Sequence, residues 1–339
     1  MNSFRIVLIL VFLYFISLSK GFSQEDTTSF KPSGKIIARS FIDYSNNFDN
    51  ESGFDITRAL LGYQYQITPT LRAQIVVDAA AGVKDDRFDP YIRNAFLNWA
   101  DKGLDINIGL TGLMQFSTQE DYWMHRYILK SFQDLNKMGE SVDLGVTAEY
   151  RFNEYISADI SFMNGEGYKH ISKDNSYKTA LGLSLRPIEN TIFRIYADIY
   201  NETEKARGEI PEELTGVEFK DQYALALFAG YQNDSFSTGI EFNKVFNKGF
   251  VDKLDYYGYS FYTSVKILPK WRVFARYDWI DSSSPSELSE PWNDDNQLII
   301  GGIEFQPLKQ LKISPNFRNT NPSIGKSEQA LFVNLEFNL

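Results

Sequence analysis

The side chains of this sequence that could bind a solute are mainly basic, and they recur at alternating positions in otherwise apolar stretches. They include Arg72, Arg151, Arg186, Arg194, Lys266, Arg272, Arg276 and Lys312. The planar guanidinium of arginine offers a fork of donors that matches phosphate or carboxylate, whereas lysine acts as a point charge. A ring of such groups around a passage selects ions by the sign of their charge. These residues therefore suggest the attraction of anions, without any bond being broken.

Catalytic chemistry finds little support in the sequence. The two histidines among the 339 residues, His125 and His170, fall in expected loops, and no G-x-S-x-G element accompanies them. Adjacent carboxylates such as Glu212 and Glu213 lie in a charge-rich stretch, 202–213, that lacks the regular ligand spacing of a calcium loop. We expect no catalytic residue, no metal site and no cofactor, and an enzyme is the less favoured alternative.

The elements that must position the basic side chains are strands. Apolar and polar residues alternate with period two along most of the chain, as in the stretch 142–152, VDLGVTAEYRF. This alternation is typical of strands that bury or expose one apolar face. Because the segments are about ten residues long, they match the length that a tilted strand needs to cross a bilayer.

Sixteen such segments can be counted, and the connections between them alternate in length. Each even-numbered segment is followed by a tight turn, as at 153–154, whereas each odd-numbered segment is followed by a longer polar connection of at least eight residues. This order predicts an all-β fold, a transmembrane antiparallel up-and-down β-barrel with short periplasmic turns and long extracellular loops. A β-sandwich or a propeller would not keep such an order. A β-solenoid needs a fixed repeat period, and the sequence shows none.

The N-terminal region is typical of an exported protein. An uncharged, mostly apolar run, 6–19, follows Arg5, so residues 1–23 are predicted to be a cleavable signal peptide. Residues 24–33 would form a short periplasmic tail and residues 34–339 the barrel. Removal of the signal peptide takes away two basic residues and changes the net charge from −10 to −12, which argues against nucleic acid as a partner. The expected location is the bacterial outer membrane, with its lipid around the barrel.

The final stretch, ALFVNLEFNL, alternates to its last residue, with Leu331, Val333, Leu335, Phe337 and Leu339 on one face. An unpaired strand of this kind is a hazard for aggregation unless another strand covers its edge. We expect it to pair with the strand around 34–44 and so close the barrel. We also expect the machinery that inserts barrels into the outer membrane to read this strand.

The interior of the barrel would receive the basic side chains. A barrel of sixteen strands is too wide for the side chains of its wall to fill, so an aqueous channel is expected. The same face also carries carboxylates, namely Asp78, Asp143, Asp159, Asp198, Asp278 and Glu149. Two interpretations stay open: the basic ring gives a preference for anions, or the carboxylates neutralise it. Replacement of Arg194 and Arg272 by Glu would shift selectivity toward cations under the first interpretation.

The third long connection, 113–140, is the longest. Its centre, TQEDYWMHRYILKSFQDL, carries aromatic residues and favours a short helix. Such a loop either packs outside the barrel against a partner or folds into the lumen and narrows it. We favour the second arrangement, which would place Arg126 and Lys130 beside the path of permeating solutes.

Several stretches together resemble a known family. They are IRNAFLNW (92–99), GLDINIGLTGLMQFS (103–117), RYILKSFQD (126–134), VDLGVTAEYRF (142–152) and MNGEGYK (163–169). In these stretches the chain is similar to the phosphate-selective porins O and P, in the form found in Bacteroidetes-type bacteria. The resemblance implies an outer-membrane barrel, a homotrimer, and a channel with an arginine ladder for phosphate. The ladder does not align with particular arginines of this chain.

The sequence thus predicts an outer-membrane porin that lets small hydrophilic solutes diffuse, with a preference for anions such as phosphate. A structural or accessory barrel that conducts nothing would share every one of these sequence features. An open lumen is what separates the two alternatives.

Overall fold

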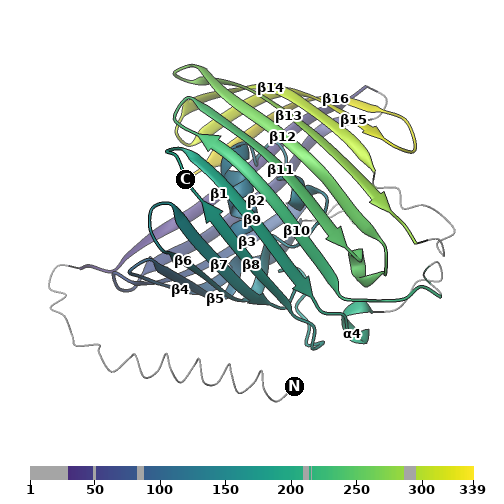
Figure 1. Ribbon diagram of the computed structural model, residues 1–339. Coiled ribbons are helices and arrows are strands. Elements are labelled where there is room, and N and C mark those ends of the chain that lie inside the picture. Colours follow the sequence, from purple (N-terminus) through teal and green to yellow (C-terminus); the bar gives the residue numbers. More distant parts are fainter. Residues whose placement is uncertain (1–29, 49–50, 82–87, 209–213, 215, 286–294) are drawn as a thin grey trace.

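The computed structural model describes residues 30–48, 51–81, 88–208, 214, 216–285 and 295–339. The expected signal peptide, 1–23, and most of the expected tail, 24–33, lie outside the described residues. Sixteen antiparallel strands form a closed barrel in which each strand pairs with its neighbours in the chain (Figure 1). The strands are β1 Ser33–Asn47, β2 Ser52–Gln66, β3 Leu71–Ala81, β4 Phe88–Asp101, β5 Leu104–Gly112, β6 Val142–Arg151, β7 Ile156–Met163, β8 Lys178–Leu185, β9 Thr191–Tyr200, β10 Gln222–Gln232, β11 Phe236–Phe246, β12 Asp255–Leu268, β13 Trp271–Ser283, β14 Asn296–Leu308, β15 Leu311–Pro322 and β16 Glu328–Asn338.

The first and last strands close the sheet. β1 pairs with β16 in antiparallel register from Arg39 opposite Asn338 to Asn47 opposite Ala330. Beyond the end of β16, the backbone N–H of Leu339 donates to the carbonyl of Ala38 at 2.9 Å. Since every strand has two partners, the sheet keeps no free edge, and the predicted closure by the final stretch is confirmed.

The two ends of the barrel differ in their connections. The turns 67–70, 102–103, 152–155, 186–190, 233–235, 269–270 and 309–310 form one end, which we name the short-turn rim. The other end, the long-loop rim, carries the longer connections, with α4 (Glu204–Arg207) and η3 (Lys248–Phe250) among them. Three connections at the long-loop rim, 48–51, 82–87 and 323–327, are shorter than the sequence predicts, because the flanking strands continue past their expected ends.

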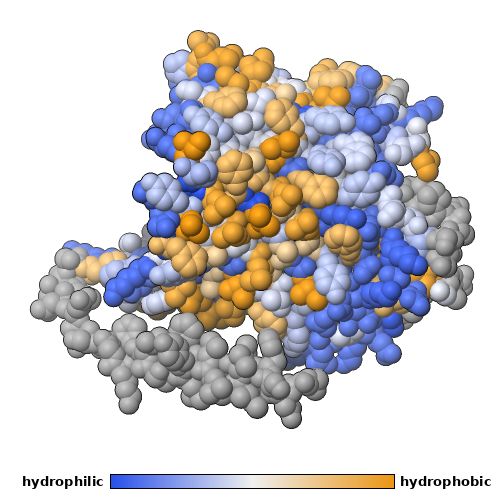
Figure 2. Space-filling model, in the orientation of Figure 1, coloured by the Kyte–Doolittle hydropathy of each residue, from blue (hydrophilic) through white to orange (hydrophobic). Residues whose placement is uncertain are grey.

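The outward face of the strands is apolar and exposed. On the last strand, Leu331, Val333 and Phe337 are exposed, whereas the intervening Asn334 and Glu336 are buried. Figure 2 shows hydrophobic side chains gathered over the middle of the strands and hydrophilic ones toward the long-loop rim. Among the described residues, no helix is long and apolar enough to cross a membrane.

Aromatic side chains on this outward face gather toward the two rims. Near the short-turn rim, Trp271 stacks on Phe305 with ring centroids 4.4 Å apart. Near the long-loop rim, Trp279 lies 5.7 Å from both Tyr257 and Tyr259. Aromatic rings with a polar edge favour the boundary between hydrocarbon and water, so the two belts bound an apolar band.

Candidate functional site

Between β5 and β6 the chain turns inward instead of extending from the rim. We name residues 113–140 the inner segment. It contains α2 (Met114–Trp123) and α3 (Phe132–Leu135), and α2 lies against β10, β11 and β12. The helix begins earlier than the sequence favours and ends at Trp123, because Met124 adopts a left-handed backbone with φ of 63°. Arg126 and Lys130 consequently lie beyond the helix.

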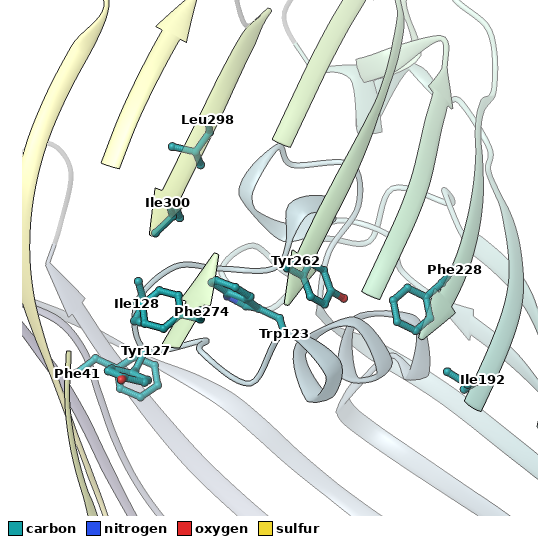
Figure 3. Close-up of a cluster of buried hydrophobic side chains, with 10 residues drawn as sticks. All are labelled: Phe41, Trp123, Tyr127, Ile128, Ile192, Phe228, Tyr262, Phe274, Leu298 and Ile300. Carbon is teal, nitrogen blue, oxygen red and sulfur yellow. The ribbon is translucent and has the colours of Figure 1, made fainter. Parts of the chain in front are cut away.

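An apolar cluster fastens the inner segment to the wall. Trp123, Tyr127 and Ile128 pack among inward side chains of strands that lie far apart in the sequence (Figure 3). These wall residues are Phe41, Ile192, Phe228, Tyr262, Phe274, Leu298 and Ile300. Trp123 is 1% exposed, and its indole N–H donates to the carbonyl of Leu129 at 2.9 Å. Burial of several large side chains stabilises this arrangement by several kcal/mol, at roughly 1.5–3 kcal/mol for each.

Hydrogen bonds of polar side chains also hold the inner segment against the same side of the wall. The side-chain amide of Gln119 donates to the carboxylate of Glu241 on β11. The hydroxyl of Tyr127 donates to Glu304 on β14 at 3.0 Å. His125 lies with Nδ1 3.1 Å from Glu304 and Nε2 3.0 Å from the hydroxyl of Ser264. A buried polar group without a partner is costly, so these pairings fix where the segment can sit.

The distances among Ser264, His125 and Glu304 match those of a serine-hydrolase triad. Their burial does not suit one, since the exposed fractions are 1%, 0% and 3% respectively. A nucleophile must meet its substrate, and this serine is enclosed by the cluster around Trp123. Burial is also the main cause that lowers the pKa of His125, against the opposing effect of Glu304. His125 serves as an anchor of the inner segment.

Three inward arginines of the wall hold the inner segment. Arg194 donates to Asp159 at 2.7 Å and to the side-chain oxygen of Gln115 at 2.9 Å. Arg276 pairs with Asp278 at 2.6 Å and donates to the carbonyl of Lys130, also at 2.6 Å. The third, Arg318, donates to the carbonyl of Ile128 at 3.0 Å. The first two, predicted from the alternation to line the pore, have side chains 1% and 0% exposed.

The remaining predicted basic residues lie toward the short-turn rim. Arg72 and Arg151 line one cavity, and the side chain of Arg151 is 69% exposed and 3.7 Å from Glu149. Arg186 donates to the hydroxyl of Ser157 at 3.2 Å, and Arg272 donates to the carbonyl of Asp234 at 2.7 Å.

Two lysines complete this set. Lys266 is exposed and sits opposite Arg272 in the register of β12 and β13. Lys312 lies 3.4 Å from Glu336 and 3.8 Å from Glu304, so two carboxylates share its charge.

The two basic residues of the inner segment belong to an ion-pair chain. Arg126 contacts Glu120 at 2.9 Å and Asp134 at 3.4 Å, and Lys130 contacts Asp134 at 3.3 Å. Burial lowers the pKa of Arg126, and the nearby positive charge of Arg58 lowers it further. Arg58, on β2, is itself paired with Asp78 at 2.9 Å. Charges of both signs therefore meet where the segment faces β2.

Sequence reasoning missed two inward arginines. Arg39 of β1 lies 3.5 Å from Glu336. The other is Arg93 of β4. A β-bulge in β4 leaves it without a partner residue on β3, since Val76 pairs with Asn94 and Val77 with Ile92. The bulge adds Arg93 to the cavity lined by Arg72 and Arg151. Its Nη1 donates to Asn94 at 2.8 Å, and it forms no ion pair with the part of the chain that the structure describes.

A signal for this bulge was present in the sequence. The exposed residues Ile92 and Ala95 are three positions apart instead of two. The strict alternation therefore breaks at the arginine, and a reading of the outward face alone could have located it.

Two cavities flank α2 on the side of the short-turn rim. The first, about 360 Å³, is lined by Arg72, Arg93 and Arg151 together with Asp105, Glu149 and Asp159. The second, about 300 Å³, is lined by Arg39, Arg126, Lys309 and Lys312 together with Glu120, Asp121 and Glu336. Both are polar and of mixed charge, so they suit hydrated solutes rather than apolar ones.

No family model and no curated protein matches this sequence. Solved structures do resemble its fold. Vibrio cholerae OmpT in its trimer form is 11% identical, with a TM-score of 0.63 over 91% of this chain and 100% of that one. Salmonella typhi OmpF is 11% identical, with a TM-score of 0.67 over 90% and 97%. An anion-selective porin from Comamonas acidovorans is 9% identical, with a TM-score of 0.67 over 91% and 100%.

The fold is that of outer-membrane porins. At identities this low the likeness concerns the barrel, its strand number and its order, and not any particular side chain. Whether the porin fold here carries a porin's function depends on the residues within the barrel.

Proposed function

We propose that this protein is an outer-membrane porin through which small hydrophilic solutes diffuse. The observation that carries the proposal is the polar, cavity-bearing interior of a closed sixteen-stranded barrel. Side chains of the wall cannot fill a barrel of this size, so the space that the inner segment leaves is available to water and solutes. An enzyme is disfavoured because His125, the histidine that contacts a serine and a carboxylate, is 0% exposed.

The barrel would sit with its short-turn rim in the periplasm and its long-loop rim outside the cell. Outer-membrane barrels have short periplasmic turns, and the two aromatic belts would lie at the lipid boundaries. Export would depend on the signal peptide 1–23, and insertion on recognition of the strand that ends at Leu339. A homotrimer is proposed from the family resemblance, and the OmpT structure of similar fold is described in a trimer form.

The inner segment would act as the constriction of the channel. It packs against the side of the lumen formed by β9 to β15 and β1, whereas the cavity of about 360 Å³ on its other side is lined mainly by β3 to β7. Glu120 and Arg126 on the segment face Arg58 and Arg93 on the wall, so a passing ion meets both signs of charge.

A preference for small anions such as phosphate is proposed from the basic residues of the short-turn rim. Arg72, Arg186, Lys266 and Arg272 of this rim form no ion pair among the described residues, so their charge remains available to solutes. Arg93, deeper in the barrel, forms none either. Arginine suits oxyanions through its donor fork. One of the structures with the same fold is described as anion-selective, which agrees with this proposal.

Conductance in planar bilayers tests the proposal. Purified protein should form discrete channels, and the reversal potential in asymmetric potassium chloride should show that chloride permeates more readily than potassium. If no channel events occur, the porin function is wrong and a non-conducting accessory barrel takes its place. Cation selectivity would contradict the anion preference alone.

A further inference from the structure

A third cavity lies on the opposite side of the inner segment, toward the long-loop rim. Its volume is about 650 Å³. Its walls come from β1, from the ends of β13 to β16 near that rim, and from the residues between Ile128 and Met138 of the inner segment. We name this space the vestibule. It belongs to neither of the short-turn-side cavities, with which it shares no lining residue.

The floor of the vestibule is apolar. Leu129 and Leu135 of the inner segment line it together with Leu298 of β14 and Phe332 of β16. The guanidinium of Arg318 stacks on Phe332 at 3.6 Å, while its hydrogen bonds go to Ile128, Asn316 and Asn334. The stacked arginine fixes the ring in place. This apolar surface lies in a polar passage and stays in contact with water. Such a surface is typical of a binding site for a solute that has an apolar part.

The rim of the vestibule carries charges of both signs on opposite walls. Lys137 is exposed on the inner segment, and Glu51 and Glu328 are exposed on the wall formed by β1, β2 and β16. None of these three side chains forms an ion pair within the described ranges of the chain. A solute in the vestibule would therefore meet an ammonium on one side and carboxylates on the other.

We infer that the vestibule binds short peptides with apolar side chains. The terminal carboxylate of the peptide would face Lys137, its terminal ammonium would face Glu51 and Glu328, and its side chains would contact Leu135 and Phe332. A site of this volume suits a small organic ligand, and a dipeptide falls in that class. The inference rests on the proposed porin function, since it names a class of solute that the channel would take up.

The test uses the dipeptide Phe-Leu on the long-loop side of single channels in a bilayer. Phe-Leu should interrupt the chloride current in resolved events, whereas Ser-Ser at the same concentration should not. Acetylation of the ammonium or amidation of the carboxylate should each shorten the events about two- to fivefold, because exposed ionic contacts contribute little. Equal effects of Phe-Leu and Ser-Ser would overturn the inference and leave the porin function intact.

Matched variants locate the site. Phe332→Ser should shorten the Phe-Leu events at least about tenfold, as expected for loss of a buried aromatic contact. Phe261→Ser, which changes an exposed aromatic residue of the outward face of β12, should leave them unchanged. If Phe332→Ser does not fold, Lys137→Asn provides the test, because asparagine tolerates the positive φ of 52° at this position. Lys137→Asn should then shorten the events about twofold.

A second measurement separates failure of the inference from failure of the proposed function. Titration calorimetry of barrels folded in detergent micelles reports Phe-Leu binding whether or not the barrel conducts. Phe332→Ser in the same micelles corrects for partitioning of the peptide into detergent. Heat that is identical for the two proteins would contradict the inference, whereas binding without conductance would contradict only the porin function.

Discussion

Two sets of inward arginines behave differently in this barrel. Arg194 and Arg276 lie under the inner segment with side chains 1% and 0% exposed, each paired with a carboxylate. Arg151, near the short-turn rim, is 69% exposed and 3.7 Å from its nearest carboxylate. All three sit on the same face of their strands. The alternation of apolar and polar residues therefore determines that an arginine side chain points into the barrel. Its tertiary contacts determine whether its charge is buried in an ion pair or accessible to solutes.

The physical reason lies in the surroundings of each pair. In a buried pair both ions have lost water, so removal of one leaves the other charge unpaired at a cost of several kcal/mol. At the rim, water screens the charges, and the pair contributes roughly 0–1 kcal/mol. Buried arginines therefore hold the inner segment, and exposed ones remain free to attract ions.

The largest effect is expected for Arg276→Met. Loss of the guanidinium strands the carboxylate of Asp278, which is 3% exposed, and should lower the free energy of unfolding by about 3–5 kcal/mol. Urea unfolding in micelles, followed by tryptophan fluorescence, measures it. The double variant Arg276→Met with Asp278→Leu should recover most of the loss. Arg151→Met should change the same quantity by less than about 1 kcal/mol. Equal losses in the free energy of unfolding for Arg276→Met and Arg151→Met would contradict the difference between buried and exposed arginines.

The next largest effect is expected for the apolar contacts that hold the inner segment against the wall. Trp123→Ala should destabilise the docked inner segment by about 3 kcal/mol, because it leaves a cavity among Tyr262, Phe274 and the histidine ring. A loosened segment should give a larger and noisier single-channel current. Phe261→Ala, on the exposed outward face of β12, serves as the control. A current unchanged by Trp123→Ala would mean that the segment does not limit the channel.

A third, smaller effect depends on pH. Burial lowers the pKa of His125, so this imidazole binds a proton less readily in the folded protein than in the unfolded chain. Its contribution to stability is present above pH about 6.5 and is lost as the pH falls through the folded pKa, by up to about 1.4 kcal/mol per pH unit. Unfolding at pH 7 and pH 5 should thus show a smaller loss for His125→Gln than for the natural protein. Equal losses would show that other groups carry the acid sensitivity.

The smallest effect distinguishes the two sets by selectivity. Arg272→Glu should change the ratio of chloride to potassium permeability by roughly twofold, since its side chain lies near the exit of the channel. Arg194→Glu would face Asp159 in a buried site, so we now expect it to prevent folding rather than to shift selectivity. Reversal potentials in asymmetric salt measure the first, and heat-modifiable migration on gels reports folding of the second. A folded Arg194→Glu with altered selectivity would contradict this assignment.

Much of the fold could be predicted from the alternation because it reflects local chemistry. Each strand repeats apolar and polar positions against lipid and lumen, so the sixteen strands, their faces and the pairing of β16 with β1 follow from the sequence. The bulge at Arg93 depends on how β4 pairs with β3. The extra length of β1 and β2, beyond their expected ends, depends in the same way on how these two strands pair with each other. The inner segment buries ion pairs such as that of Arg194 with Asp159. No pattern within a single strand therefore predicts them.

The contact between Arg39 and Asn338 also has a kinetic consequence. It joins strands from opposite ends of the chain, so it has among the largest sequence separations of any pairing in the fold, and the entropy of closing so long a loop opposes it until the other strands have formed. Closure should therefore be the last and slowest step of assembly. Until that step, both edge strands stay exposed, and a chaperone that holds the chain open would be needed for the whole of that interval.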